Sequence, residues 1–131
     1  MRWAKAAAVY FVIGSILGMY MSIVEKFNYA ALHAHLNLLG WASMAIFAVL
    51  FKVFPQLEQS KLAAWQFWLH QICFPIFMIA LFLILSENPL GTKIIPFGAS
   101  PTLLSIILFA IMVWLNIKQP GAAAGAERKS A

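Results

Sequence analysis

Charged side chains are scarce in this chain, and their scarcity excludes an ordinary soluble domain. Only 10% of the 131 residues are charged and 63% are hydrophobic, whereas soluble domains carry about a quarter charged residues. The mean hydropathy is +0.87. A soluble fold of this length has too little interior to bury so much apolar surface. The composition therefore predicts an all-α integral membrane protein.

Acidic residues and cysteine are scarcer still, which excludes several kinds of site. None of the four acidic residues lies deep in an apolar run, so an intramembrane carboxylate for proton-coupled transport and an acid for a Ser–His–Asp triad are both lacking. The single cysteine, Cys73, cannot form an intrachain disulfide. The sequence has no phosphate-binding loop, dinucleotide glycine pattern or Cys-x-x-Cys-His motif for covalent haem attachment. The chemistry that remains rests on three histidines.

Four apolar runs are long enough to cross a bilayer, which takes about 20 residues. They cover approximately residues 3–24, 29–54, 62–85 and 101–117. We expect a bundle of four transmembrane helices over residues 1–118, followed by a disordered tail at 119–131 with the low-complexity sequence QPGAAAGAERKSA.

The connections between the runs differ in length. Residues 25–28 and 55–61 are short links, so the first two spans should form a tight antiparallel hairpin. The connection 86–100 is the longest and contains proline and glycine, which predicts a loop over one membrane face. Within the first span, Gly14 and Gly18 form a small-xxx-small pattern that allows close helix packing.

The formal net charge of +5 is distributed unevenly about the spans. Seven basic residues lie on the side of both termini: Arg2, Lys5, Lys52, Lys61, Lys118, Arg128 and Lys129. Only Lys26 and Lys93 lie on the other side. The positive-inside rule then places both termini in the cytoplasm, in a bacterial inner membrane. The basic residues flank the spans, so they predict contact with the lipid bilayer and no nucleic-acid partner.

Two of the histidines, His33 and His35, start the second span from the outer side and are separated by one residue. Positions two apart on an α-helix differ by about 200°, so these imidazoles cannot hold one metal ion on their own helix. Both become buried if each faces a different neighbouring copy in a closed ring. A histidine pair on facing helices is a common axial ligand set for b-type haem. The alternative is that each histidine only bonds a nearby backbone carbonyl.

The stretch HAHLNLLGWASMAIFAVLFKVFP, residues 33–55, resembles the tenth helix of haem–copper oxidase subunit I. That helix has a His-x-His pair near its outer end and an aromatic-Pro terminus, here Phe54-Pro55. The stretch WQFWLHQICFPIFMIALFL, residues 65–83, is similar to the eleventh helix of that family. The resemblance makes this chain a short four-helix relative of helices nine to twelve.

The resemblance implies a fold, a cofactor and an assembly. In that family the two histidines of the pair ligate two different haems on opposite sides of the helix. His33 and His35 would accordingly each serve a different haem b. The family's twelve helices form three arcs of four, which implies a homotrimer for a four-helix chain. The family's copper site needs three further histidines, and only His70 remains, so bound copper and oxygen reduction are not expected.

The same resemblance implies contacts to the cofactor. Haem propionates would point to the outer side, where Lys26, Lys93, Asn28 and Tyr29 provide cations and donors. Trp41 is a candidate for packing against the macrocycle. His70 lies on the third span at a different depth from His35, so it is expected to bond a backbone carbonyl or to line a polar pocket for a quinone or a proton path.

The sequence thus predicts a membrane b-type cytochrome that transfers electrons, with a quinone or another cytochrome as redox partner. Two alternatives use the same residues. One is a haem or copper carrier or sensor with labile occupancy. The other is an accessory membrane subunit without haem, whose histidines only form local hydrogen bonds.

Overall fold

The computed structural model describes residues 2–117, and all its regular elements are helical. Their order is α1 (Arg2–Val24), α2 (Ala30–His35), the π-helical η1 (Leu36–Ala42), α3 (Ser43–Val53), the 3-10 helix η2 (Pro55–Leu57), α4 (Lys61–Leu85) and α5 (Leu90–Asn116). Because α2, η1 and α3 follow one another without a break, residues 2–117 contain four helices long and apolar enough to cross a membrane. The tail predicted at 119–131 lies outside the described residues.

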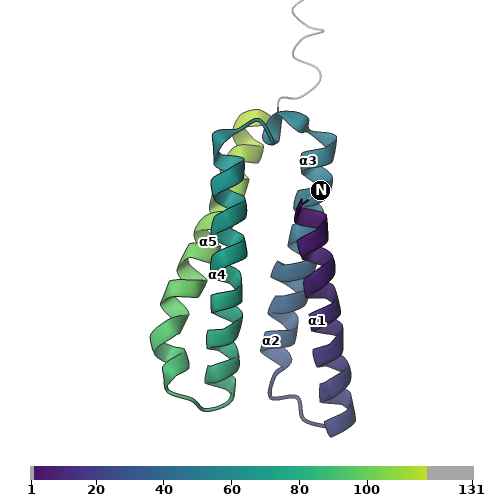
Figure 1. Cartoon of the computed structure of the whole chain (residues 1–131), viewed down its shortest axis with the longest axis vertical. Helices are drawn as coiled ribbons and strands as arrows, with labels where there is room; N and C mark the ends of the chain where they lie inside the picture. Colours follow the sequence, from purple (N-terminus) through teal and green to yellow (C-terminus); the bar gives the residue numbers. More distant parts are fainter. Residues whose placement is uncertain (1, 118–131) are drawn as a thin grey trace, which may run out of the picture.

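The molecule consists of two helical hairpins that stand side by side (Figure 1). One hairpin pairs α1 with the α2–η1–α3 span, and the other pairs α4 with α5. The start of α1, the link through η2 and the end of α5 all lie toward one end of the bundle, which we call the terminus end. The connections after α1 and after α4 lie at the opposite end, the loop end (Figure 1).

The prediction of a long loop at 86–100 is wrong. Helix α5 begins at Leu90 and continues through Pro96 and Pro101, so the fourth span starts eleven residues before the expected position 101. In an apolar environment a helix satisfies its own backbone groups, and prolines are tolerated where neighbouring side chains bond the freed carbonyls. The carbonyls that lose a backbone donor here are those of Thr92 and Phe97, four residues before each proline. Thr102 Oγ1 donates to the neighbouring Gly98 carbonyl at 2.7 Å.

Glycines allow α5 to pack closely on α4. A Cβ built on Gly91 would lie 2.7 Å from the Ala80 carbonyl oxygen, and one on Gly98 would lie 2.3 Å from the Phe77 backbone nitrogen. Neither position has room for a side chain. The proline- and glycine-containing segment that suggested a loop is therefore a helix–helix contact surface.

The core at the terminus end is a cluster of aromatic rings around Trp3. The Trp3 indole meets Phe67 edge-on at 4.8 Å between ring centroids and Phe47 at 5.2 Å. Phe109 of α5 lies 4.0 Å from Phe47. Each of these four side chains is buried, so the two hairpins are joined here by apolar packing with favourable ring geometry.

The two connections at the loop end have the same backbone conformation and the same hydrogen-bond pattern. Glu25 after α1 and Glu87 after α4 have left-handed backbone angles, with φ of 52° and 60°. The Lys26 amide then bonds the Met21 carbonyl at 3.2 Å, and the Asn88 amide bonds the Leu83 carbonyl at 2.8 Å. Both turns are Schellman motifs, in which glycine is the usual left-handed residue.

Candidate functional site

His33 lies between its own helix and α1. Its Nδ1 is 2.9 Å from the carbonyl oxygen of Gly14. A carbonyl oxygen only accepts, so Nδ1–H donates and the neutral ring keeps a lone pair on Nε2. A Cβ on Gly18 would lie 2.7 Å from Cε1 of this imidazole, so the absence of a side chain at Gly18 makes room for the ring. The expected close contact at the Gly14 and Gly18 pair is confirmed.

Asn37, one turn beyond His33, contacts both His33 and helix α1. Its Nδ2 donates to the His33 carbonyl oxygen at 2.9 Å. The same nitrogen is 3.5 Å from His33 Nε2, which is at the outer limit for a hydrogen bond. A Cβ on Gly14 would lie 2.7 Å from Asn37 Nδ2. The two glycines of α1 thus accommodate the two polar side chains of the second span.

His35 has the same hydrogen-bond pattern on another side of the helix. Its Nδ1 lies 2.8 Å from the Ala31 carbonyl oxygen, so this ring also donates through Nδ1 and keeps its lone pair on Nε2. The ring meets Phe77 of α4 edge-on, with centroids 5.2 Å apart. Both histidines are half-buried.

The two imidazoles therefore face different helices, His33 toward α1 and His35 toward α4. The angular prediction that they cannot share a metal ion on their own helix agrees with this arrangement. Within residues 2–117, no group of three or more His, Cys, Asp or Glu side chains is placed to hold a metal ion. An iron atom held by both kinds of histidine would therefore need the Nε2 of His33 from one copy of the chain and the Nε2 of His35 from another.

A π-helical segment follows His35 directly. Through Leu36–Ala42 the hydrogen bonds span five residues, as in the bond from the Ser43 amide to the Leu38 carbonyl. Such wide turns are rare and occur often at functional sites. The amino-acid sequence gave no signal for this segment, because its composition is that of an ordinary apolar helix.

The predicted propionate contacts lie at or near the loop end. Lys26 and Asn28 are exposed in the connection before α2, and Lys93 is exposed in the second turn of α5. Tyr29 bridges the hairpins, because its hydroxyl is 3.0 Å from Ser86 Oγ. Its ring also stacks on Phe82 at 5.3 Å.

The remaining predicted residue, Trp41, packs against α1. Its ring lies 4.5 Å from that of Phe11 and is partly exposed. It is therefore on the α1 side of the second span, as His33 is, and away from the His35–Phe77 contact.

A second polar cluster lies inside the bundle around His70, which is fully buried. Ser105 Oγ donates its only proton to the Thr102 carbonyl at 2.7 Å. It therefore accepts from His70 Nδ1, also 2.7 Å away, and His70 Nε2 is unprotonated in the neutral ring. His70 Nε2 has no hydrogen-bond partner within residues 2–117.

Gln66, one turn before His70, was not singled out from the sequence. It is fully buried, and neither amide atom has a hydrogen-bond partner in the described part of the chain. The available signal was its spacing, since two polar residues four apart lie on the same helix face. The partner of His70 is the Ser105 hydroxyl of α5, and no backbone carbonyl among the described residues accepts from it, although one alternative had predicted such a bond.

No known protein family, curated protein or solved structure matches the chain in sequence or structure comparisons.

Proposed function

We propose that the chain is a membrane b-type cytochrome that binds haem between copies of itself, with His33 of one protomer and His35 of the next as axial ligands. Electron transfer within the membrane is the proposed activity, and a quinone or another cytochrome is the proposed partner. The proposed setting is a bacterial inner membrane, with the terminus end in the cytoplasm.

One observation supports the proposal: the hydrogen bonds of both histidines would leave Nε2 available to a metal. In each, Nδ1–H donates to a backbone carbonyl, of Gly14 for His33 and of Ala31 for His35. Such a bond fixes the tautomer and ring orientation of a ligating histidine and leaves Nε2 for the metal. Haem iron accepts imidazole nitrogen from either side of its plane, so the donor set fits haem b.

The chain's own residues would prepare the site before haem binds. The Gly14 and Ala31 carbonyls hold the two rings, and Gly18 leaves the space that the His33 ring occupies. Haem supplies one-electron redox chemistry when it is bound. Since its two axial positions would both be taken by histidine, the site favours electron transfer over binding of a gaseous ligand.

The arrangement of the two histidines supports ligation between copies. The two rings face different helices of one protomer. Each protomer would therefore contribute one axial histidine to each of two haem sites. When head-to-tail contacts close into a ring, the neighbouring copy supplies the second histidine of every site. A trimer gives three equivalent sites and twelve membrane helices, which is the proposed assembly.

An optical spectrum of the protein purified after expression with ample haem tests the proposal. We expect a sharp reduced α band and a Soret band of six-coordinate low-spin haem b in the wild type. His33→Ala and His35→Ala should each lose that spectrum, because each removes one axial nitrogen from every site. His70→Asn is the matched control and should keep it, since His70 bonds Ser105 inside the bundle.

Two results would contradict the proposal. A wild-type protein that stays free of haem under these conditions would favour an accessory subunit whose histidines only bond carbonyls. Haem that is retained in both alanine variants would assign ligation to other residues.

A further inference from the structure

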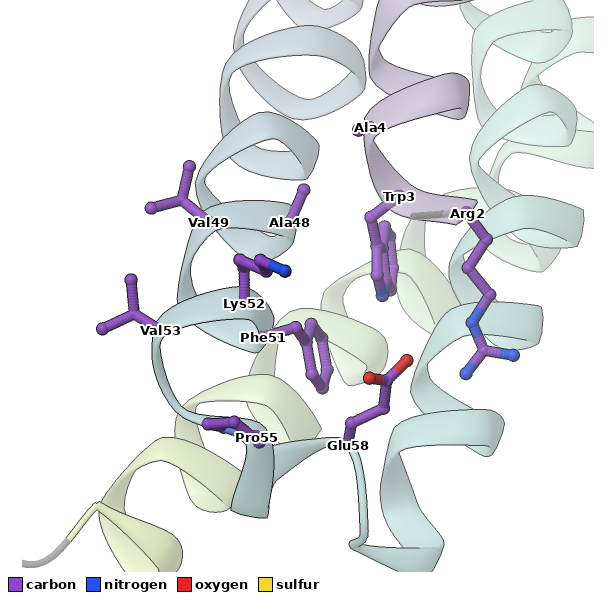
Figure 2. Close-up of a pocket in the computed structure, with 10 residues that line it drawn as sticks. All are labelled: Arg2, Trp3, Ala4, Ala48, Val49, Phe51, Lys52, Val53, Pro55 and Glu58. Carbon is purple, nitrogen blue, oxygen red and sulfur yellow. The ribbon is translucent and has the colours of Figure 1, made fainter.

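A hollow of about 610 Å³ opens at the terminus end, between the start of α1 and the end of α3 (Figure 2). Its size is within the range of about 300–1,000 Å³ that is typical of small-molecule sites. It lies at the other end of the bundle from the predicted propionate contacts (Figure 1). Ten residues line it: Arg2, Trp3, Ala4, Ala48, Val49, Phe51, Lys52, Val53, Pro55 and Glu58.

Charged groups of both signs line this hollow. Arg2 is held in place, because its guanidinium carbon lies 4.5 Å from the centre of the Phe67 ring in a cation–π contact. Lys52, in the last turn of α3, supplies a second cation. The Glu58 carboxylate points into the hollow beside Phe51, and the Trp3 indole nitrogen is on the ring edge nearest Glu58 (Figure 2). The lining therefore combines two cations, one carboxylate and an N–H donor.

The rest of the lining is apolar and continues onto the outer face of α3. Val49 and Val53 line the hollow, and their side chains are 60% and 59% exposed. On a helix apolar enough to cross a membrane, exposed valines offer a surface for lipid chains. The hollow thus has a charged side at the helix ends and an apolar side along the helix, which is the polarity of a phospholipid.

We propose that this hollow binds one aminophospholipid of the leaflet at the terminus end. Arg2 and Lys52 hold the lipid phosphate, since basic pockets between membrane helices bind phospholipid head groups. Glu58 pairs with the ammonium of the head group, and an acyl chain lies along Val49 and Val53. The two cations and one carboxylate of the lining match the phosphate and the ammonium in sign.

The role of Glu58 distinguishes this ligand from a purely anionic one. A lipid with a phosphate and no cation would place a second negative charge near the exposed Glu58 carboxylate, and like charges repel. An ethanolamine head group contributes the missing cation. Phosphatidylethanolamine should therefore bind more tightly than phosphatidylglycerol, although the latter has the greater net negative charge.

Native mass spectrometry of the full chain in detergent, titrated with each lipid, tests the proposal. We expect one phosphatidylethanolamine per protomer in the wild type. Lys52→Gln should weaken binding of both lipids about fivefold, as expected for loss of one cation near a phosphate. Glu58→Gln should weaken phosphatidylethanolamine and spare phosphatidylglycerol. Lys61→Gln is the matched control, because Lys61 is exposed at the same end and does not line the hollow.

Three outcomes would overturn the assignment. Equal lipid binding by the Lys52 and Lys61 variants would show that only general surface charge acts. A preference for phosphatidylglycerol that Glu58→Gln leaves unchanged would exclude the ammonium contact. Displacement of the lipid by inorganic phosphate or by soluble glycerophosphoethanolamine would make this an anion site without a role for the acyl chain. None of these results depends on whether haem binds at His33 and His35.

Discussion

At the scale of single residues, hydrogen bonding separates the three histidines into two kinds. His33 and His35 bond backbone carbonyls near the helix surface and keep partly exposed rings. His70 bonds the Ser105 hydroxyl and is fully buried. All three donate through Nδ1, so the difference between a ligand candidate and a core residue lies in the access to Nε2, which spacing in the sequence does not reveal.

The His70–Ser105 bond should contribute measurably to stability. Ser105→Ala leaves the buried Nδ1–H without an acceptor, and this should lower the free energy of unfolding by about 1–3 kcal/mol. Chemical unfolding of the purified protein in detergent measures the change. Ser100→Ala on the exposed side of the same helix is the control. Equal small effects of the two substitutions would contradict the tautomer assigned to His70.

At the scale of elements, the tightest contact in the molecule is the packing of α5 on α4. Gly91 and Gly98 are seven residues apart and meet backbone atoms of α4. Buried Thr102 and Ser105 continue the same face of α5. Small side chains along one face allow two apolar helices to approach closely, and van der Waals contact then holds the pair together.

Gly98→Ala should separate these two helices. The new Cβ would lie 2.3 Å from the Phe77 backbone nitrogen, and backbone cannot rotate aside, so stability should fall by about 1–3 kcal/mol or more. Thermal unfolding in detergent provides the measurement. Gly14→Ala is a suitable comparison, since its Cβ would meet only the Asn37 side chain. A smaller loss for Gly98→Ala than for Gly14→Ala would contradict the packing described here.

The elements that could be predicted from the sequence are those whose position depends on the hydropathy and length of an apolar run. Three of the four spans were placed to within one or two residues, and the Gly14 and Gly18 contact was anticipated, because runs of about 20 apolar residues and small-xxx-small patterns are direct physical signals. The start of α5 was missed because Pro96 and Gly98 usually end helices in water. The π-helical segment was missed because its composition is that of an ordinary apolar helix. The His70–Ser105 contact joins two helices, so only the Gln66–His70 spacing was visible in the sequence.

At the scale of the whole molecule, the candidate haem ligands and the proposed lipid site belong to different parts of the bundle. His33 and His35 lie in the loop-end half of their span, whereas Lys52 and Glu58 lie at the terminus end (Figures 1 and 2). The aromatic cluster around Trp3, which borders the hollow, connects the hairpins at the terminus end. Variants at one site should therefore leave the other intact.

Mixing two inactive variants tests ligation between copies. If each site uses His33 of one protomer and His35 of the next, any trimer that contains both His33→Ala and His35→Ala protomers has one complete site of three. Three-quarters of randomly mixed trimers contain both, so co-expression should restore about a quarter of the wild-type low-spin haem. Ligation within one protomer predicts no recovery. Native mass spectrometry of the same sample should show mixed trimers.

The π-helical turn at Leu36–Ala42 has a consequence for how the second span is built. Each residue of an α-helix advances about 100° around the axis, and one wide turn contains one residue more than the regular helix would. The part before the turn, with His33 and His35, is therefore rotated relative to the part that packs Phe47 into the core. The single helix behaves as two segments with separate facing directions, so the contacts of His33 with α1 and of His35 with α4 are set independently of the face that packs Phe47 into the core.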